Sequence, residues 1–174
     1  MSREEFLARV RAAAHAGRAY RVHVDDVDPA KGYVGARCDD LCESMAAEVN
    51  EVGGFAHIVA DGQAARQQVL DLLAQYQAKR VLLWQHEVID ALRLESALSD
   101  TGIEFFDYEQ LHTMDADEAR SAYMAAEVGI TSCDIAIAET GSLVVCSKPG
   151  QERIASLVTP IHIAVVTRAQ IVPD

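Results

Sequence analysis

Apolar and polar residues between positions 55 and 126 alternate in blocks that switch between strand-like and helix-like spacing. This pattern predicts strands at 55–60, 80–84 and 103–106, and helices at 61–76, 88–98 and 115–126. Asp61 and Asp115 are the predicted N-caps of two of these helices, and Gly102 ends the helix between them. Strands that alternate with helices favour a parallel sheet with right-handed crossovers.

The residues before this region predict two helices separated by a polar connector. Ser2 and Glu5 form a capping box for an amphipathic helix at 2–16 that ends at Gly17. The connector at 18–37 contains one short alternation, at 20–24, that predicts an edge strand. A second helix is expected from Asp39 or Asp40 to the Gly53-Gly54 pair, with Cys38 and Cys42 as small buried residues on one helix face.

Two short apolar stretches, at 134–138 and 143–146, meet at the polar residues Glu139-Thr140-Gly141-Ser142 and predict a β-hairpin. A short helix at 151–157 and a strand at 161–166 follow. The predicted fold class is therefore α/β: an open, mostly parallel sheet with helices on both faces plus a β-hairpin. The length of 174 residues predicts a single domain, with an N-terminal helical and loop region at 1–54 and an α/β core at 55–174.

The composition narrows the range of possible functions. The chain has 27 acidic and 15 basic residues, a net charge of −12, so it would repel nucleic acid and anionic lipid surfaces. No apolar run reaches the roughly 20 residues that cross a bilayer, and the start lacks a signal-peptide core, so we expect a cytoplasmic protein with no membrane insertion. The four cysteines lack metal or iron-sulfur spacing, so we expect no metal or cofactor on this chain itself.

The hairpin turn is the strongest candidate site. Glu139 follows small apolar residues that could tune its pKa for a role as base or nucleophile. The N–H groups of Thr140, Gly141 and Ser142, with two hydroxyls, would form a nest for a carboxylate or phosphate. Arg153 could bind the same acidic ligand through its fork of donors. The alternative is a plain turn whose polar residues face solvent.

Several other residues are weaker candidates. Thr131 and Glu127 are placed near the carboxyl end of the helix at 115–126, where they would face the hairpin tip. His162 lies in an apolar strand, where a histidine is more often structural than a ligand. His86 and Glu87 follow a predicted strand, a position that open sheets use for ligands.

The segments Gly129–Val145, P-G-Q-E-R at 149–153, P-I-H-I-A-V-V at 160–166 and I-V-P at 171–173 together resemble the lactate-utilisation protein C family, whose shared unit is the LUD domain. The resemblance implies a fold similar to the sugar-phosphate isomerase and coenzyme A transferase superfamily. It also implies a place in a three-protein bacterial system that oxidises L-lactate to pyruvate, with iron-sulfur clusters in the partner proteins. The family motif falls on the following positions: Thr131, Asp134, Glu139, Thr140, Gly141, Ser142, Arg153, Pro160 and His162.

Three functions stay open at this point. The first is a subunit of the lactate-oxidising system that binds a small organic acid or the iron-sulfur partners. The second is a stand-alone enzyme in which Glu139 acts on a coenzyme A ester, a sugar phosphate or a folate-like ligand. The third is a non-catalytic assembly factor that uses the hairpin tip as a contact point.

Overall fold

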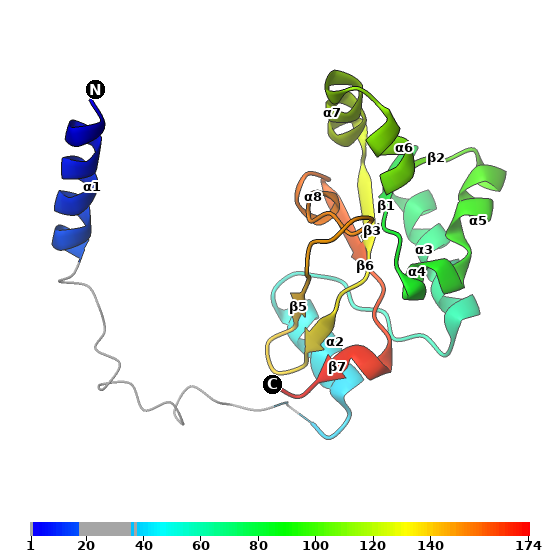
Figure 1. Cartoon of the computed structure of the whole chain (residues 1–174). Helices are drawn as coiled ribbons and strands as arrows, with labels where there is room; N and C mark the ends of the chain where they lie inside the picture. The colour runs from blue at the N-terminus through cyan, green and yellow to red at the C-terminus, as the bar shows by residue number, and fades with distance from the viewer. Residues whose placement is uncertain (1, 18–35, 37) are drawn as a thin grey trace. The chain divides into compact units, whose positions relative to one another are not determined.

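The computed structural model of the chain describes residues 2–17, 36 and 38–174 (Figure 1). Its contacts divide the chain into two compact units, residues 1–34 and 35–174. The first unit contains α1 (Arg3–Gly17), where the Glu5 N–H donates to Ser2 Oγ and the Ser2 N–H donates to Glu5 Oε2. This is the predicted capping box. The strand predicted at 20–24 lies outside the described residues.

The main sheet of the second unit contains four parallel strands in the order β2-β1-β3-β6. They are β1 (Arg80–Leu83), β2 (Glu104–Phe106), β3 (Val128–Thr131) and β6 (Ile161–Ala164). All four residues of β3 are buried, because it lies between β1 and β6 in the middle of the sheet. The predicted α/β class with a parallel sheet is therefore confirmed.

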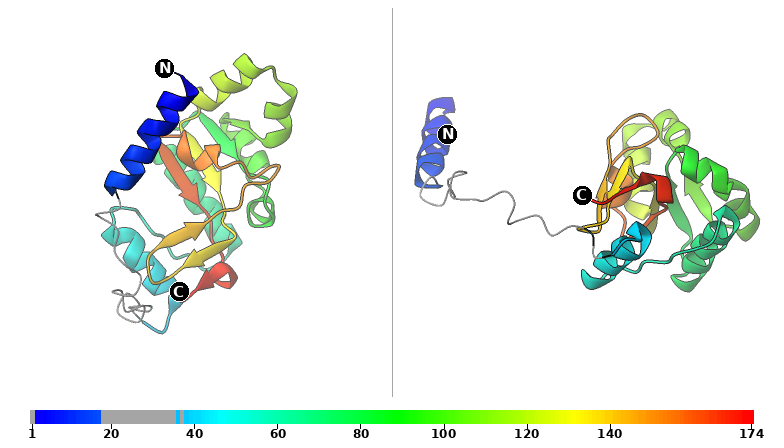
Figure 2. Two further views of the ribbon diagram at one scale, coloured as in Figure 1. Left: turned by 60° about the vertical axis from the view of Figure 1, so that its left-hand side comes forward. Right: turned by 90° about the horizontal axis from the view of Figure 1, so that it is seen from below.

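Alternate residues of β1, continued by Trp84 directly after it, contribute to the cores on the two faces of this sheet. Val81 and Leu83 belong to a cluster with α3 (Gly62–Gln75), α4 (Glu87–Leu92) and α5 (Leu94–Thr101). Leu82 and Trp84 belong to a second cluster with α6 (Tyr108–Thr113), α7 (Ala116–Ala125) and α8 (Ile154–Leu157). Figure 2 shows these two layers from other sides.

A smaller sheet with the order β5-β4-β7 contains the predicted hairpin. Its strands are β4 (Ile135–Ile137), β5 (Ser142–Val144) and β7 (Ile171–Val172), with β5 antiparallel and β7 parallel to β4. The short 3-10 helix η4 (Arg168–Gln170) leads into β7. One face of this sheet packs against α2 (Leu41–Glu51), around Met45 and Ala136.

Helix caps explain several element boundaries. The carboxylates of Asp40, Asp61, Asp107 and Asp115 accept N–H groups in the first turns of α2, α3, α6 and α7. At Asp115, Glu118 completes a capping box. The Asp61 and Asp115 caps were predicted from the sequence, and α2 was predicted to start at Asp39 or Asp40, of which Asp40 is the cap. The Asp107 cap and α6 were not predicted.

Four local predictions were wrong. Residues 55–60 form no strand, because no described strand pairs with them. The helix predicted at 88–98 is broken into α4 and α5 at Arg93, whose φ of 50° is left-handed. Thr131 ends a central strand instead of following a helix, because α7 stops at Ala125. Cys38 is exposed and precedes α2.

Candidate functional site

The tip of the hairpin, residues 138–141, contacts the residue after β7 through Glu139 and lies against α2 at Gly141. The N–H of Glu139 donates to the Pro173 carbonyl at 3.0 Å, beyond β7. Thr140 Oγ1 donates to Ser142 Oγ at 2.8 Å, so the two hydroxyls interact with each other. Gly141 has a φ of 66°, and a Cβ there would come within 3.1 Å of Glu48 Cβ on α2. Glu139 is half-buried, and its catalytic role stays a prediction.

Asp134 stands at the base of the same hairpin and joins its two arms. Its Oδ2 accepts the N–H of Cys146 at 2.7 Å, and its Oδ1 lies 3.6 Å from Lys148 Nζ. The Cys146 hydrogen bond is the main reason why the pKa of the Asp134 carboxyl is below its usual range, and Lys148 adds to the effect. This geometry gives Asp134 a structural task, and a ligand would have to share the carboxylate with both groups.

Thr131 and His162 meet across β3 and β6. Thr131 Oγ1 lies 2.7 Å from His162 Nε2, although the residues are 31 positions apart. Thr131 is fully buried and His162 is exposed, yet the surroundings of the ring are crowded enough that desolvation lowers the pKa of His162. Desolvation therefore favours the neutral imidazole. Of the predicted site residues, these two form the contact that links distant segments of the main sheet.

The P-G-Q-E-R segment folds against the residues that follow β1. The N–H of Gln85 donates to the Gly150 carbonyl at 2.9 Å, and Gln151 Nε2 donates to the Gln85 carbonyl at 3.0 Å. Trp84 Nε1 donates to the Glu152 carbonyl at 3.0 Å. Gln151 is buried, and its Oε1 has no hydrogen-bond partner among the residues that the structure describes.

Arg153, the residue after this network, is exposed at the start of α8. The predicted clamp of Arg153 on a ligand at the hairpin tip stays a prediction.

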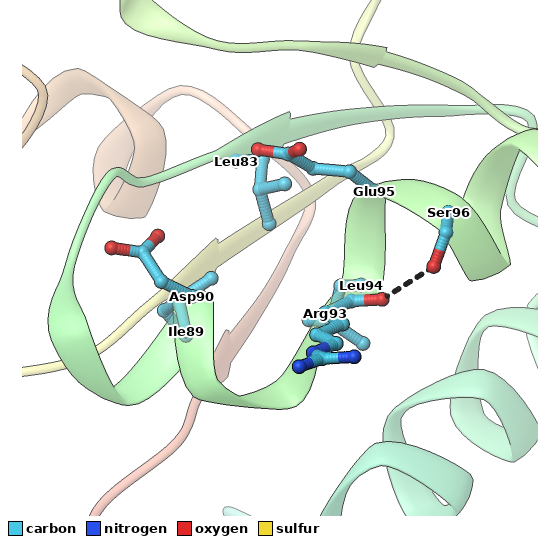
Figure 3. Close-up of a pocket in the computed structure, with 7 residues that line it drawn as sticks. All are labelled: Leu83, Ile89, Asp90, Arg93, Leu94, Glu95 and Ser96. Carbon is cyan, nitrogen blue, oxygen red and sulfur yellow. Dashed lines mark hydrogen bonds between the residues drawn. The ribbon is translucent and has the colours of Figure 1, made fainter.

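A cavity of about 470 Å³ lies where α4 meets α5 (Figure 3). Its base is apolar, with Leu83 at the end of β1, while Asp90, Arg93 and Glu95 bring charges to its rim. Ser96 Oγ donates to the Arg93 carbonyl at 3.1 Å. Because two carboxylates lie beside one guanidinium, the charge of the rim does not favour the binding of a small anion. None of the predicted site residues lines this cavity.

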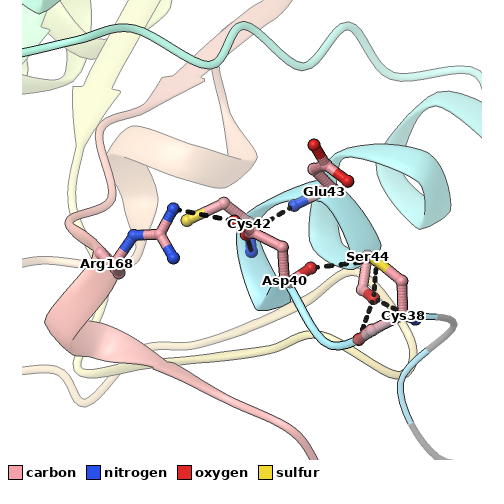
Figure 4. Close-up of polar contacts among 6 residues, drawn as sticks. All are labelled: Cys38, Asp40, Cys42, Glu43, Ser44 and Arg168. Atoms are coloured by element: carbon pink, nitrogen blue, oxygen red, sulfur yellow. Dashed lines mark hydrogen bonds and ion pairs between the residues drawn. The ribbon is translucent and has the colours of Figure 1, made fainter.

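A second polar cluster surrounds the start of α2 (Figure 4). Arg168 Nη2 lies 3.1 Å from Asp40 Oδ2, and this hydrogen bond is the main reason why the pKa of Asp40 is lowered. Ser44 Oγ accepts the N–H of Cys38 at 3.0 Å. The cluster anchors the amino end of α2 to η4.

Glu127 and His86 also have structural partners. Glu127 Oε2 accepts the N–H groups of Lys79 and Arg80, and these bonds lower the pKa of Glu127. His86 Nδ1 accepts the N–H of Val88 at the start of α4. Both interactions fix the ends of elements in the main sheet and its helices.

Sequence reasoning missed Trp84, Gln85 and Gln151 as a connected group. The sequence signal for this group was weak, because it consists of one aromatic residue and two amides, and Gln85 and Gln151 are 66 positions apart. Within residues 2–17, 36 and 38–174, no cluster of three or more His, Cys, Asp or Glu is arranged to hold a metal ion. In the same residues, no helix is long and apolar enough to span a bilayer.

Comparisons with known proteins find relatives that are named for lactate utilisation. A protein named Lactate utilization protein C from Halalkalibacterium halodurans is 29% identical over 62% of this chain and 44% of its own length. Lactate utilization protein B from Shouchella clausii is 20% identical over 78% of this chain and 38% of its own. The chain thus spans less than half the length of these relatives.

Among solved structures, a DUF162 family protein from Deinococcus radiodurans shares the fold, with a TM-score of 0.59 and 23% identity. The match covers 77% of this chain and 73% of that one. Residues 42–174 match the LUD domain, which covers the main sheet, the hairpin and α2. This chain therefore belongs to the LUD domain family.

Proposed function

We propose that this chain is a component of a bacterial lactate-utilisation system that oxidises L-lactate to pyruvate together with iron-sulfur partner proteins. The observation that supports this most is the LUD domain match over residues 42–174, together with relatives named lactate utilization protein B and C. In this proposal the chain binds a small organic acid in the cytoplasm, and the partners carry the electrons.

The pair of Thr131 and His162 is our candidate for contact with that acid. In this proposal the Thr131 hydroxyl donates to Nε2 of a neutral imidazole, which then carries its proton on Nδ1. That N–H would donate to a carboxylate oxygen of the acid. Thr140, Gly141, Ser142 and Arg153 remain proposed contacts of the same ligand. Asp134 is retained as a supporting residue of the hairpin.

Deletion of the coding sequence in the source organism tests the pathway. We expect loss of growth on L-lactate as sole carbon source, with normal growth on pyruvate, because the defect would lie before pyruvate. A tagged copy should restore growth and co-purify iron-sulfur proteins, detected by their visible absorbance. Unchanged lactate consumption in the deletion strain would refute the proposal.

Point variants of the restoring copy test the site. We expect His162→Gln and Glu139→Gln to slow growth on lactate, while His112→Gln and Glu109→Gln, exposed residues on α6, do not. Circular dichroism must show equal folding of all four proteins. Full growth with both site variants would remove these residues from the proposed site without touching the pathway assignment.

A further inference from the structure

The segment between α2 and α3 has the sequence of a buried strand but lies open in the structure. Its residues 54–59 run without helix, strand, turn or bend, and a bend follows at Ala60 (Figure 1). Phe55 is 78% exposed and Ile58 is 60% exposed, and Val52 just before them is 78% exposed. Apolar side chains gathered at this exposure mark an interaction surface more often than a solvent-facing loop.

The hydrogen bonds of this segment indicate which edge is open. The N–H of Ala56 donates to Asn50 Oδ1 at 2.9 Å, toward α2. In an extended segment, successive backbone groups point to opposite sides. Phe55, His57 and Val59 therefore direct their N–H and C=O groups away from Asn50, and none of these groups has a hydrogen-bond partner among the described residues.

This open edge is complementary to itself. If two copies pair antiparallel with His57 opposite His57, Phe55 of one copy lies opposite Val59 of the other. The backbone groups that are open on one copy then meet those of the second copy as hydrogen-bonded pairs. An aromatic residue opposite a β-branched one is a favourable cross-strand pair. Ala56 and Ile58 form the corresponding pair on the other face.

The lack of charged residues in this segment favours a second copy of the chain as its partner. Residues 52–60 contain no Asp, Glu, Lys or Arg, in a chain whose net charge is −12. A charged partner strand would find nothing to pair with here, and burial of its charges would cost free energy. A second copy presents the same uncharged strand, so the two acidic chains can approach at this place.

We propose that residues 55–59 are a dimerisation strand, which pairs antiparallel with the same segment of a second copy of the chain. The inference is independent of the lactate-utilisation proposal, because it uses only this segment and its surroundings. Strand addition of this kind gives affinity through main-chain hydrogen bonds and specificity through alternate side chains.

Sedimentation velocity on the full chain over a range of concentrations tests the proposal. We expect a monomer-dimer equilibrium that tightens as salt rises, because salt screens the repulsion between two acidic chains. Val59→Asp should weaken the dimer by about tenfold or more, because it places an unpaired charge in the strand pair. Leu157→Asp is the matched control, since Leu157 is 77% exposed on α8, and it should leave the dimer unchanged.

The double variant Phe55→Lys with Val59→Asp tests the register. The introduced lysine of one copy would face the introduced aspartate of the other, so the double variant should regain much of the dimerisation that Val59→Asp loses. A monomeric wild-type chain at every concentration would overturn the proposal. A dimer that survives Val59→Asp, or a double variant no better than the single one, would also overturn it.

Discussion

We expect Gly129→Ala to destabilise the protein strongly. A Cβ on Gly129, in the middle of β3, would lie 1.8 Å from the carbonyl oxygen of Ala155 on α8, where ordinary contact begins at 3.4 Å. The strand and the helix would have to separate by about 1.6 Å. The start of α8 is held by the hydrogen bond from Trp84 to the Glu152 carbonyl, so this movement breaks other contacts.

Forced separation of packed elements costs about 3 kcal/mol or more, at the upper end of the range for overpacked cores. For a domain of this size, each kcal/mol lowers the melting temperature by about 3 °C, so we expect a fall of about 10 °C. Thermal unfolding followed by circular dichroism or calorimetry measures this value.

Two other glycines serve as controls. Gly62→Ala, at the start of α3, meets only Leu92 Cδ2 at 3.6 Å and should change the melting temperature little. Gly102→Ala meets nothing within 4 Å but has a φ of 73°, so it should cost only the backbone term of about 1–2 kcal/mol. If Gly129→Ala melts within a few degrees of the wild type, the close packing of α8 on β3 is wrong.

Three further predictions follow from the ionisable groups. Burial lowers the pKa of His162 below its unfolded value of 6.5, so the unfolded chain binds more protons than the folded chain just below pH 6.5. The free energy of unfolding should therefore fall as the pH drops through that window. In urea unfolding, His162→Gln should make this fall smaller. The pKa of Asp134 is also lowered, so its contribution is present above pH 3.8 and is lost as pH falls below it; Asp134→Ala should cost about 1–2 kcal/mol at pH 7 in the same assay. Burial raises the pKa of the Cys133 thiol to about 11. At neutral pH, N-ethylmaleimide should therefore modify the exposed Cys38 and Cys146 and leave Cys133 unmodified until the protein unfolds. Peptide mass spectrometry measures which cysteines are modified. Early labelling of Cys133 would contradict its burial.

Features that depend on a few neighbouring residues were predicted well. The capping aspartates Asp40, Asp61 and Asp115 mark helix starts because a side-chain oxygen reaches N–H groups only two or three residues on. The β1 strand and the hairpin follow from short apolar runs beside turn residues. Such signals lie within one window of the sequence, so no knowledge of the rest of the chain is needed.

The errors and omissions have a different origin. The run at 55–60 has strand composition, but a strand also needs a partner, and composition does not supply one. β3 was missed because its four residues, with Gly129 among them, look like a helix end when read alone. The left-handed conformation of Arg93 leaves no signal in the residue type.

For the candidate site, too, the choice of residues came from the sequence and their contacts came from the tertiary structure. The sequence alone selected His162 in its apolar strand and Thr131 near a predicted helix end, and the family resemblance added Asp134. It also determined the local elements, because capping and periodicity act over a few residues. Only the tertiary structure decided that Thr131 meets His162 and that Asp134 holds Cys146 and Lys148. The reason is physical: strand order and side-chain contacts across a sheet depend on which distant segments share hydrogen bonds, and close packing at positions such as Gly129 selects among those arrangements.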